Sequence, residues 1–147
     1  MAFSIRLLPE RVPESEVGNA AQYGEIQLRN YQETFVALIG FWSPLDYSEH
    51  WSHSIKRLVD LKRESCLITS LHDPQVAEVL HWWLLYPVGD DVIVQNSLLL
   101  GRHALSDFDT RNPYRSIPIR RRVNEEGEKI SEWFMHLTDF RDFLERS

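Results

Sequence analysis

The chain has 147 residues, of which 43% are hydrophobic and 12% aromatic, and it contains one cysteine. This composition predicts a single folded domain over residues 1–147 without an internal disulfide. The net charge of −6 argues against a dedicated nucleic-acid-binding protein, whose affinity comes from Lys and Arg, but it suits a basic protein partner. Because the sequence shows neither a signal peptide nor a membrane-spanning run, we expect a cytoplasmic protein that does not contact membranes.

The first 24 residues carry the weakest pattern in the chain. Phe3, Ile5 and Leu7 alternate with polar residues for a short distance, but two prolines and two glycines follow before residue 25. Such residues interrupt regular elements. We therefore predict an irregular lead-in over residues 1–24 and a β-rich core over residues 25–147.

Regular alternation begins at Glu25 and predicts a strand there, followed by a second strand or a bulged continuation over Thr34–Trp42. A helix is predicted next, over residues 44–61. Ser43 supplies a capping hydroxyl before Pro44 at the first helical position. Apolar residues then recur at helical spacing along one face.

After a strand over Ser65–His72, two apolar runs flank the turn sequence Pro87–Asp91 and predict a central β-hairpin. In the first run, Val79–Tyr86, both alternating sets are mostly apolar. Both faces of this strand should therefore be covered. His81 is interpreted as a core or sheet-face histidine.

The last third of the chain contains weaker patterns. An edge strand limited by Pro118 is predicted over Arg115–Val123, and a turn over Asn124–Glu128. A last strand is predicted over Lys129–Leu137, and a terminal helix capped by Thr138 over residues 138–146. Short connections favour antiparallel pairing. The fold class predicted is α+β, mainly β: a twisted, antiparallel, sandwich-like β structure with one inserted helix and one C-terminal helix.

The sequence offers no catalytic residues, metal site or cofactor motif with a supporting pattern, so we expect a protein that is not an enzyme. His50 and His53 lie one helical turn apart, but no further metal ligand stands at a recognisable spacing. Cys66 could be paired with His72 or His81 as nucleophile and base, although a buried structural cysteine is the ordinary interpretation.

Two groups of charged residues are candidate binding sites. Acidic residues gather in three loops and would form an acidic face if these loops lie on one side of the fold. The candidate contact residues are Asp90, Asp91, Asp107, Asp109, Glu125, Glu126 and Glu128. The basic run Arg115, Arg120, Arg121 and Arg122 could instead hold single-stranded nucleic acid, but the adjacent glutamates could neutralise it across a hairpin.

The order of several motifs resembles one family of immunity proteins from bacterial contact-dependent growth inhibition systems. The resemblance covers about Ile26 to the C-terminus. It rests on the strand ending Phe41-Trp42, the helix opening Asp46-Tyr47 and carrying Trp51, the strand Val92–Asn96, and Lys129–Trp133 followed by a short helix. These motifs are structural, so no active site is transferred with them.

The resemblance implies a cytosolic protein that binds the toxic C-terminal domain of a cell-surface effector and protects the producing cell. In the branch that the chain most resembles, the toxin looks like a ribosomal-RNA-cleaving nuclease, and the immunity protein covers its active site. A nuclease is usually basic around its active site, so an acidic inhibitor suits it. This interpretation involves no cofactor and no direct contact with nucleic acid.

Two alternatives remain open at this point. A single-stranded nucleic-acid-binding domain would use the Arg115–Arg122 segment and would show salt-sensitive binding to oligonucleotides. A small enzyme would use His50 with His53, or Cys66, and would lose activity when one of these residues is replaced.

Overall fold

The computed structural model describes residues 2–146, within which seven strands form two antiparallel sheets. The three-stranded sheet has the order β1-β2-β3 and the four-stranded sheet the order β4-β5-β6-β7. The strands are β1 Phe3–Val12, β2 Ala21–Leu28, β3 Tyr31–Leu38, β4 Ser65–Ser70, β5 Val79–Val88, β6 Asp91–Leu100 and β7 Glu132–His136. The helices are α1 Glu14–Val17, α2 Pro44–Leu61, α3 Arg102–Ser106, the 3₁₀ helix η1 Pro113–Ser116, and α4 Leu137–Arg146. The predicted α+β, mainly β class is confirmed.

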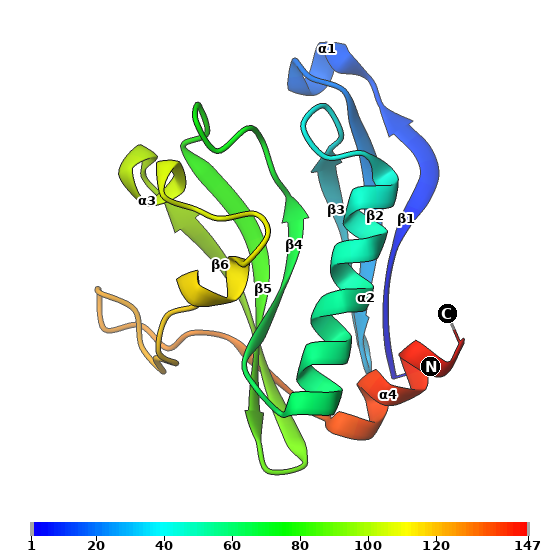
Figure 1. Cartoon of the computed structure of the whole chain (residues 1–147), viewed down its shortest axis with the longest axis vertical. Coiled ribbons are helices and arrows are strands. Elements are labelled where there is room, and N and C mark those ends of the chain that lie inside the picture. The colour runs from blue at the N-terminus through cyan, green and yellow to red at the C-terminus, as the bar shows by residue number, and fades with distance from the viewer. Residues whose placement is uncertain (1, 147) are drawn as a thin grey trace.

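The two sheets meet along the neighbouring edges of β3 and β4, and α2 lies over this seam (Figure 1). The backbone N–H of Leu38 in β3 donates to Oγ of Ser70 in β4 at 3.3 Å. The hydroxyl of Tyr47 on α2 donates to the carbonyl oxygen of Leu38. Side chains thus connect two sheet edges that do not pair as strands.

Polar side chains of α2 also hydrogen-bond backbone groups along the edge of β4 that does not pair with β5. Nε2 of His50 accepts a hydrogen bond from the N–H of Ile68 at 2.9 Å, and Nε1 of Trp51 donates to the carbonyl oxygen of Ile68 at 2.8 Å. The Tyr47 hydroxyl accepts from the N–H of Leu71 at 2.9 Å. These groups would otherwise need a neighbouring strand, because buried backbone groups require partners.

The predicted helix over residues 44–61 is confirmed as α2, and its first turn has the expected cap. Ser43 Oγ accepts from the N–H of Asp46 at 3.1 Å, and the Asp46 carboxylate accepts from the N–H of Ser43 at 2.8 Å. Pro44 occupies the first helical position. This reciprocal capping satisfies two backbone donors at the helix start.

The central hairpin is confirmed as β5 and β6, with β5 between β4 and β6 and Gly89 adopting a φ of 62° in the turn. The expectation that both faces of β5 are covered holds for Trp82–Tyr86, which are buried. It is wrong at Val79 and His81, which are exposed. The reason is tertiary: α3 and Phe108 cover the other face of the sheet here, where Leu80 and Trp82 are buried, but the face that carries Val79 and His81 stays open to water.

Residues 3–12 and 21–24, predicted to be irregular, belong to β1 and β2, which is a correction; residue 1 lies outside the described residues. Phe3 pairs with Leu28 and is fully buried. The register shifts between Leu7 and Arg11, so a bulge accommodates Pro9 in an edge strand. Pairing with β2 makes this segment a strand, although its own residue pattern does not predict one.

The strand predicted over Thr34–Trp42 is displaced toward the N-terminus. It is β3, Tyr31–Leu38, and it follows a tight turn in which Arg29 adopts a positive φ of 57°. β3 is therefore a separate strand paired with β2, not a bulged continuation of it.

The predicted edge strand Arg115–Val123 is wrong. The segment begins in η1 and forms no ladder, apart from an isolated bridge between Val123 and Lys129. Pro118 lacks the N–H that a ladder needs, and its carbonyl oxygen accepts a hydrogen bond from the Tyr86 hydroxyl at 2.9 Å. The segment packs as a loop against the four-stranded sheet. The Asn124–Glu128 turn is confirmed.

The last strand and the terminal helix are confirmed with different ends. β7 is restricted to Glu132–His136, and α4 begins at Leu137. Thr138 lies inside α4 and does not cap it. The carboxylate of Asp139 instead accepts from the N–H of His136 at 2.8 Å, which satisfies a donor at the helix start.

Candidate binding surfaces

The first pair of candidate acids lies in the β5–β6 turn, where each side chain already has a partner. Oδ1 of Asp90 accepts from Nζ of Lys62 at 3.0 Å, and Oδ1 of Asp91 lies 2.8 Å from Nδ1 of His136. All four side chains are more than half exposed. Because such exposed pairs are weak, a basic partner could replace these contacts at little cost.

The second pair lies beyond the other end of β6. Asp107 follows α3 and is exposed, and Oδ1 of Asp109 accepts from the N–H of Arg111 at 2.9 Å. β6 has ten residues, so roughly 30 Å separates its two ends. Figure 1 shows the β5–β6 turn and α3 at opposite ends of the four-stranded sheet. The structure therefore does not bring these two acidic pairs together.

The three glutamates Glu125, Glu126 and Glu128 are exposed in the predicted turn. Oδ1 of Asn124 orders this turn by accepting from the N–H groups of Glu126 and Glu128, each at 2.9 Å. The glutamate side chains remain on the outside of the loop. Like the other acidic residues of the three loops, they stay predicted contact residues.

The arginines of residues 115–122 do not form the expected charged strand. Nε and an Nη of Arg120 donate to the two carboxylate oxygens of Glu132, each at 2.7 Å. These hydrogen bonds are the main cause that holds the pKa of Glu132 below its usual value, and they raise the pKa of Arg120. The Arg120 charge is thereby compensated within the chain, and Arg115 lies apart in η1.

The side chains considered for a small enzyme are built into the fold. His50 accepts a backbone hydrogen bond through Nε2, and burial lowers its pKa from 6.5 to about 3. Burial raises the pKa of the Cys66 thiol, which opposes formation of a nucleophilic thiolate. His81 lies on the opposite face of the sheet from Cys66, by strand alternation. Residues 2–146 contain no cluster of three potential metal ligands.

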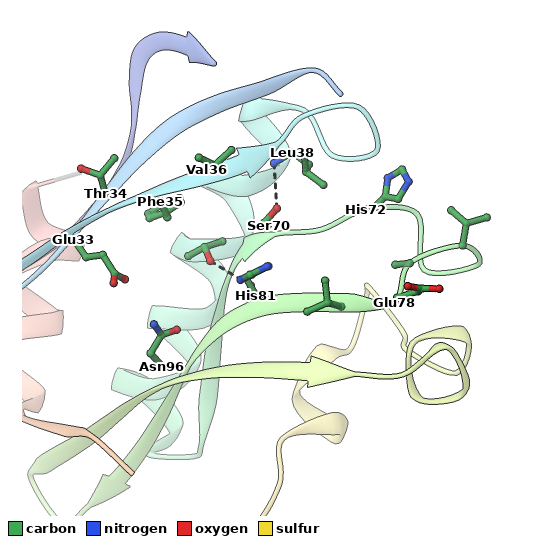
Figure 2. Close-up of a pocket in the computed structure, with 14 residues that line it drawn as sticks. Glu33, Thr34, Phe35, Val36, Leu38, Ser70, His72, Glu78, His81 and Asn96 are labelled. Carbon is green, nitrogen blue, oxygen red and sulfur yellow. Dashed lines mark hydrogen bonds between the residues drawn. The ribbon is translucent and has the colours of Figure 1, made fainter. Parts of the chain in front are cut away.

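A groove of about 660 Å³ lies between β3 on one side and β5 and β6 on the other (Figure 2). Its floor includes the seam at Ser70, and its ends are marked by Glu33 and Asn96 on one side and by His72 and Glu78 on the other. We call this site, with all of its lining residues, the groove. The other lining residues are Thr34, Phe35, Val36, Leu38, Thr69, Val76, Ala77, Val79 and His81.

Exposed apolar side chains continue from the groove along the same face of the β5–β6 hairpin. Val79 pairs with Leu100, and His81 pairs with Leu98, so the four side chains share one face of the sheet. Leu98 is 49% exposed and Leu100 is 64% exposed. We call these four residues the open end. Contiguous exposed apolar residues of this kind often mark contact surfaces.

The groove is not evident from the sequence, because the apolar run of β5 predicts that both faces of this strand are covered. A weak signal was present: His81 and Asn96 are polar residues on the face that also carries Trp83. Alternation alone does not distinguish a buried polar side chain from the start of an exposed surface.

Comparison with known proteins identifies the family. A family model described as the CdiI N-terminal domain matches residues 37–143, so the chain belongs to this family of immunity proteins from contact-dependent growth inhibition systems. It is similar to "Immunity protein CdiI" from Enterobacter cloacae subsp. cloacae, with 28% identity over 131 residues, which are 89% of this chain and 90% of that protein.

A solved structure shows the same architecture over nearly the full length. The structure is described as "CdiA-CT/CdiI toxin and immunity complex from Enterobacter cloacae". One of its chains matches with a TM-score of 0.87 and 27% identity, over 98% of this chain and 97% of that chain. The predicted membership of the immunity protein family is confirmed. In residues 2–146, no helix has the length and apolar character needed to cross a bilayer.

Proposed function

We propose that this chain binds the C-terminal toxin domain of a contact-dependent growth inhibition effector and neutralises it in the cytoplasm of the producing cell. The observation that carries the proposal is the match, over nearly all of both chains, to a chain of a toxin and immunity complex. A binding role requires affinity and specificity and no reacting group. His50 and Cys66, whose side chains serve the fold, are compatible with a role that needs no reacting group.

We infer that the toxin is a basic nuclease that cleaves ribosomal RNA and that this chain covers its active site in an equimolar complex. The net charge of −6 supports a basic partner, because complementary potentials accelerate encounter and suppress wrong partners. The seven acidic loop residues Asp90, Asp91, Asp107, Asp109, Glu125, Glu126 and Glu128 are proposed as rim contacts that steer the toxin.

Calorimetric titration against the purified C-terminal domain of the effector encoded beside this chain tests the function. We expect an equimolar complex with nanomolar or tighter affinity, about −12 kcal/mol. The same equimolar mixture should stop cleavage of ribosomal RNA by that domain. The toxin domain of an unrelated effector is the control and should give no heat.

Charge reversal tests the steering role of the loops. Replacing Asp90 and Asp91 by Lys should slow association and reduce its dependence on salt, with a smaller effect on dissociation, because exposed rim charges act mainly on the encounter rate.

Absence of any complex with the wild-type chain would overturn the immunity function. Titration of single-stranded RNA would then examine the arginine segment.

A further inference from the structure

The groove combines an acidic character with apolar walls. Glu33 and Glu78 are the carboxylates that line it, and no Lys or Arg of the described residues does so. Neither carboxylate belongs to an ion pair within residues 2–146. The groove therefore presents negative charge that the described part of the chain leaves without a cation.

Glu33 is placed on the inner face of the three-stranded sheet. It follows Tyr31 by two residues on β3, and the Tyr31 hydroxyl donates to Glu33 Oε1 at 3.1 Å. Burial is the main cause that raises the pKa of Tyr31, and the hydrogen bond to Glu33 adds to it. The phenol thus stays a neutral donor to the Glu33 carboxylate. Figure 2 shows Glu33 at one end of the groove.

The walls provide apolar area beside this charge. Val76 is 53% exposed and Val79 is 36% exposed at the groove, and Leu98 continues the same face next to His81. The fold gains little from apolar side chains that remain in water. A partner that covers them would remove this area from water and would also exclude water from the glutamates.

We propose that the groove is the main contact site for the toxin domain and that it receives a segment carrying a Lys or Arg side chain flanked by aliphatic or aromatic residues. The inference rests on the proposed function and names the surface and the chemistry that it uses. The cationic head would approach Glu33 at one end of the groove or Glu78 at the other, while its apolar neighbours would lie on Val79 and Leu98.

The dimensions and the position of the groove support this assignment. Its volume of about 660 Å³ lies within the range of sites that enclose small ligands or a few side chains. Strong contacts in protein interfaces concentrate in concave, desolvated positions, whereas exposed rim charges contribute less. The acidic loops project from the surface and the groove is recessed, so we expect dissociation to depend on the groove.

Two sets of variants test this proposal in the titration against the same effector domain. Glu33→Gln with Glu78→Gln removes both charges with little change in volume, and the glutamine at position 33 keeps an oxygen for the Tyr31 hydroxyl. Leu98→Lys replaces an exposed apolar contact by a like charge. Each set should weaken the complex at least about tenfold, mainly through faster dissociation.

Matched controls lie outside the groove. Glu10→Gln with Glu49→Gln removes two exposed glutamates from β1 and α2, and Leu45→Lys places the same lysine at an exposed leucine of α2. These variants should bind within about twofold of wild type. Circular dichroism and urea unfolding verify that every variant is folded before it is titrated.

The outcomes separate this inference from the function on which it rests. If the wild-type chain binds the toxin domain and the groove variants bind equally well, the groove assignment is wrong and the immunity function stands. If the groove variants and the control variants lose affinity to the same extent, the assignment is also wrong. If the wild-type chain does not bind, the proposed function fails first.

Discussion

The middle of the β5–β6 hairpin and the end where β5 begins differ sharply in what covers them. Halfway along β5, the ring of Trp83 packs against Trp133 with centroids 5.3 Å apart, and Trp133 packs against Tyr31 at 4.9 Å. We call these three residues the aromatic bridge, because their rings join the two sheets. At the open end, two residues before Trp83, His81 is exposed beside the groove.

This difference shows how one strand can serve stability and recognition. Trp83 is 1% exposed, whereas Leu98, two residues along β6 from the partner position of Trp83, is 49% exposed. Core positions that obey the apolar pattern stabilise the fold, and positions that depart from it are where function is expected. Two predictions test whether the aromatic bridge and the open end are as different energetically as they are structurally, and a third places the seam at His50 between them.

The largest effect should follow from Trp83→Ala in the aromatic bridge. Removing the indole leaves a cavity between Trp133 and the sheet, and such changes cost about 3–5 kcal/mol in the free energy of unfolding. Urea denaturation followed by circular dichroism measures the loss. A cost below about 1 kcal/mol would contradict the idea that these aromatic rings hold the two sheets together.

A smaller effect should come from protonation of His50 at the seam. The pKa of His50 is lowered from 6.5 to about 3, so between these values the unfolded chain takes up a proton that the folded chain does not. The free energy of unfolding should therefore fall as pH decreases below 6.5, by up to about 1.4 kcal/mol per pH unit. Its stabilising contribution is fully present above pH 6.5.

The variant His50→Gln isolates this effect from the other titrating groups. Glutamine supplies an acceptor for the N–H of Ile68 but does not titrate. Between pH 7 and pH 5, the wild-type chain should lose about 2 kcal/mol more stability than the variant. Equal losses in urea unfolding at the two pH values would show that His50 is protonated as readily in the folded state as in the unfolded state.

The smallest effect should follow from Leu98→Ala at the open end. Because Leu98 is half exposed and makes its remaining contacts on an uncovered sheet face, the free energy of unfolding should change by about 0.5 kcal/mol or less. The same urea titration used for Trp83→Ala gives this value. A loss above about 2 kcal/mol would mean that Leu98 belongs to the core and that the open end is not open.

Much of the architecture could be predicted from local patterns in the sequence. The bounds of α2, its cap at Ser43 and Asp46, and the central hairpin around Gly89 all follow from short-range chemistry. Each depends on residues within a few positions of one another. The order of these elements also carried the family resemblance, which the match over residues 37–143 confirms.

The local pattern failed where pairing joins distant segments. β1 looked irregular because Pro9 interrupts it, yet its pairing with β2 makes it a strand with Phe3 in the core. The Arg115–Val123 segment alternated like a strand but has no partner to pair with, apart from one bridge at Val123. Strand formation depends on a neighbour, which a single segment does not report.

Local spacing and side-chain chemistry are sufficient to specify the helix α2, the hairpin and the apolar series that fill the core. Which of the apolar residues are covered depends instead on tertiary packing. It buries Trp83 and leaves Val79 exposed on the same strand, and it separates Asp90 from Asp107 by the length of β6. The physical reason is that exposure depends on what packs opposite a residue, and those partners come from elements far away in the chain.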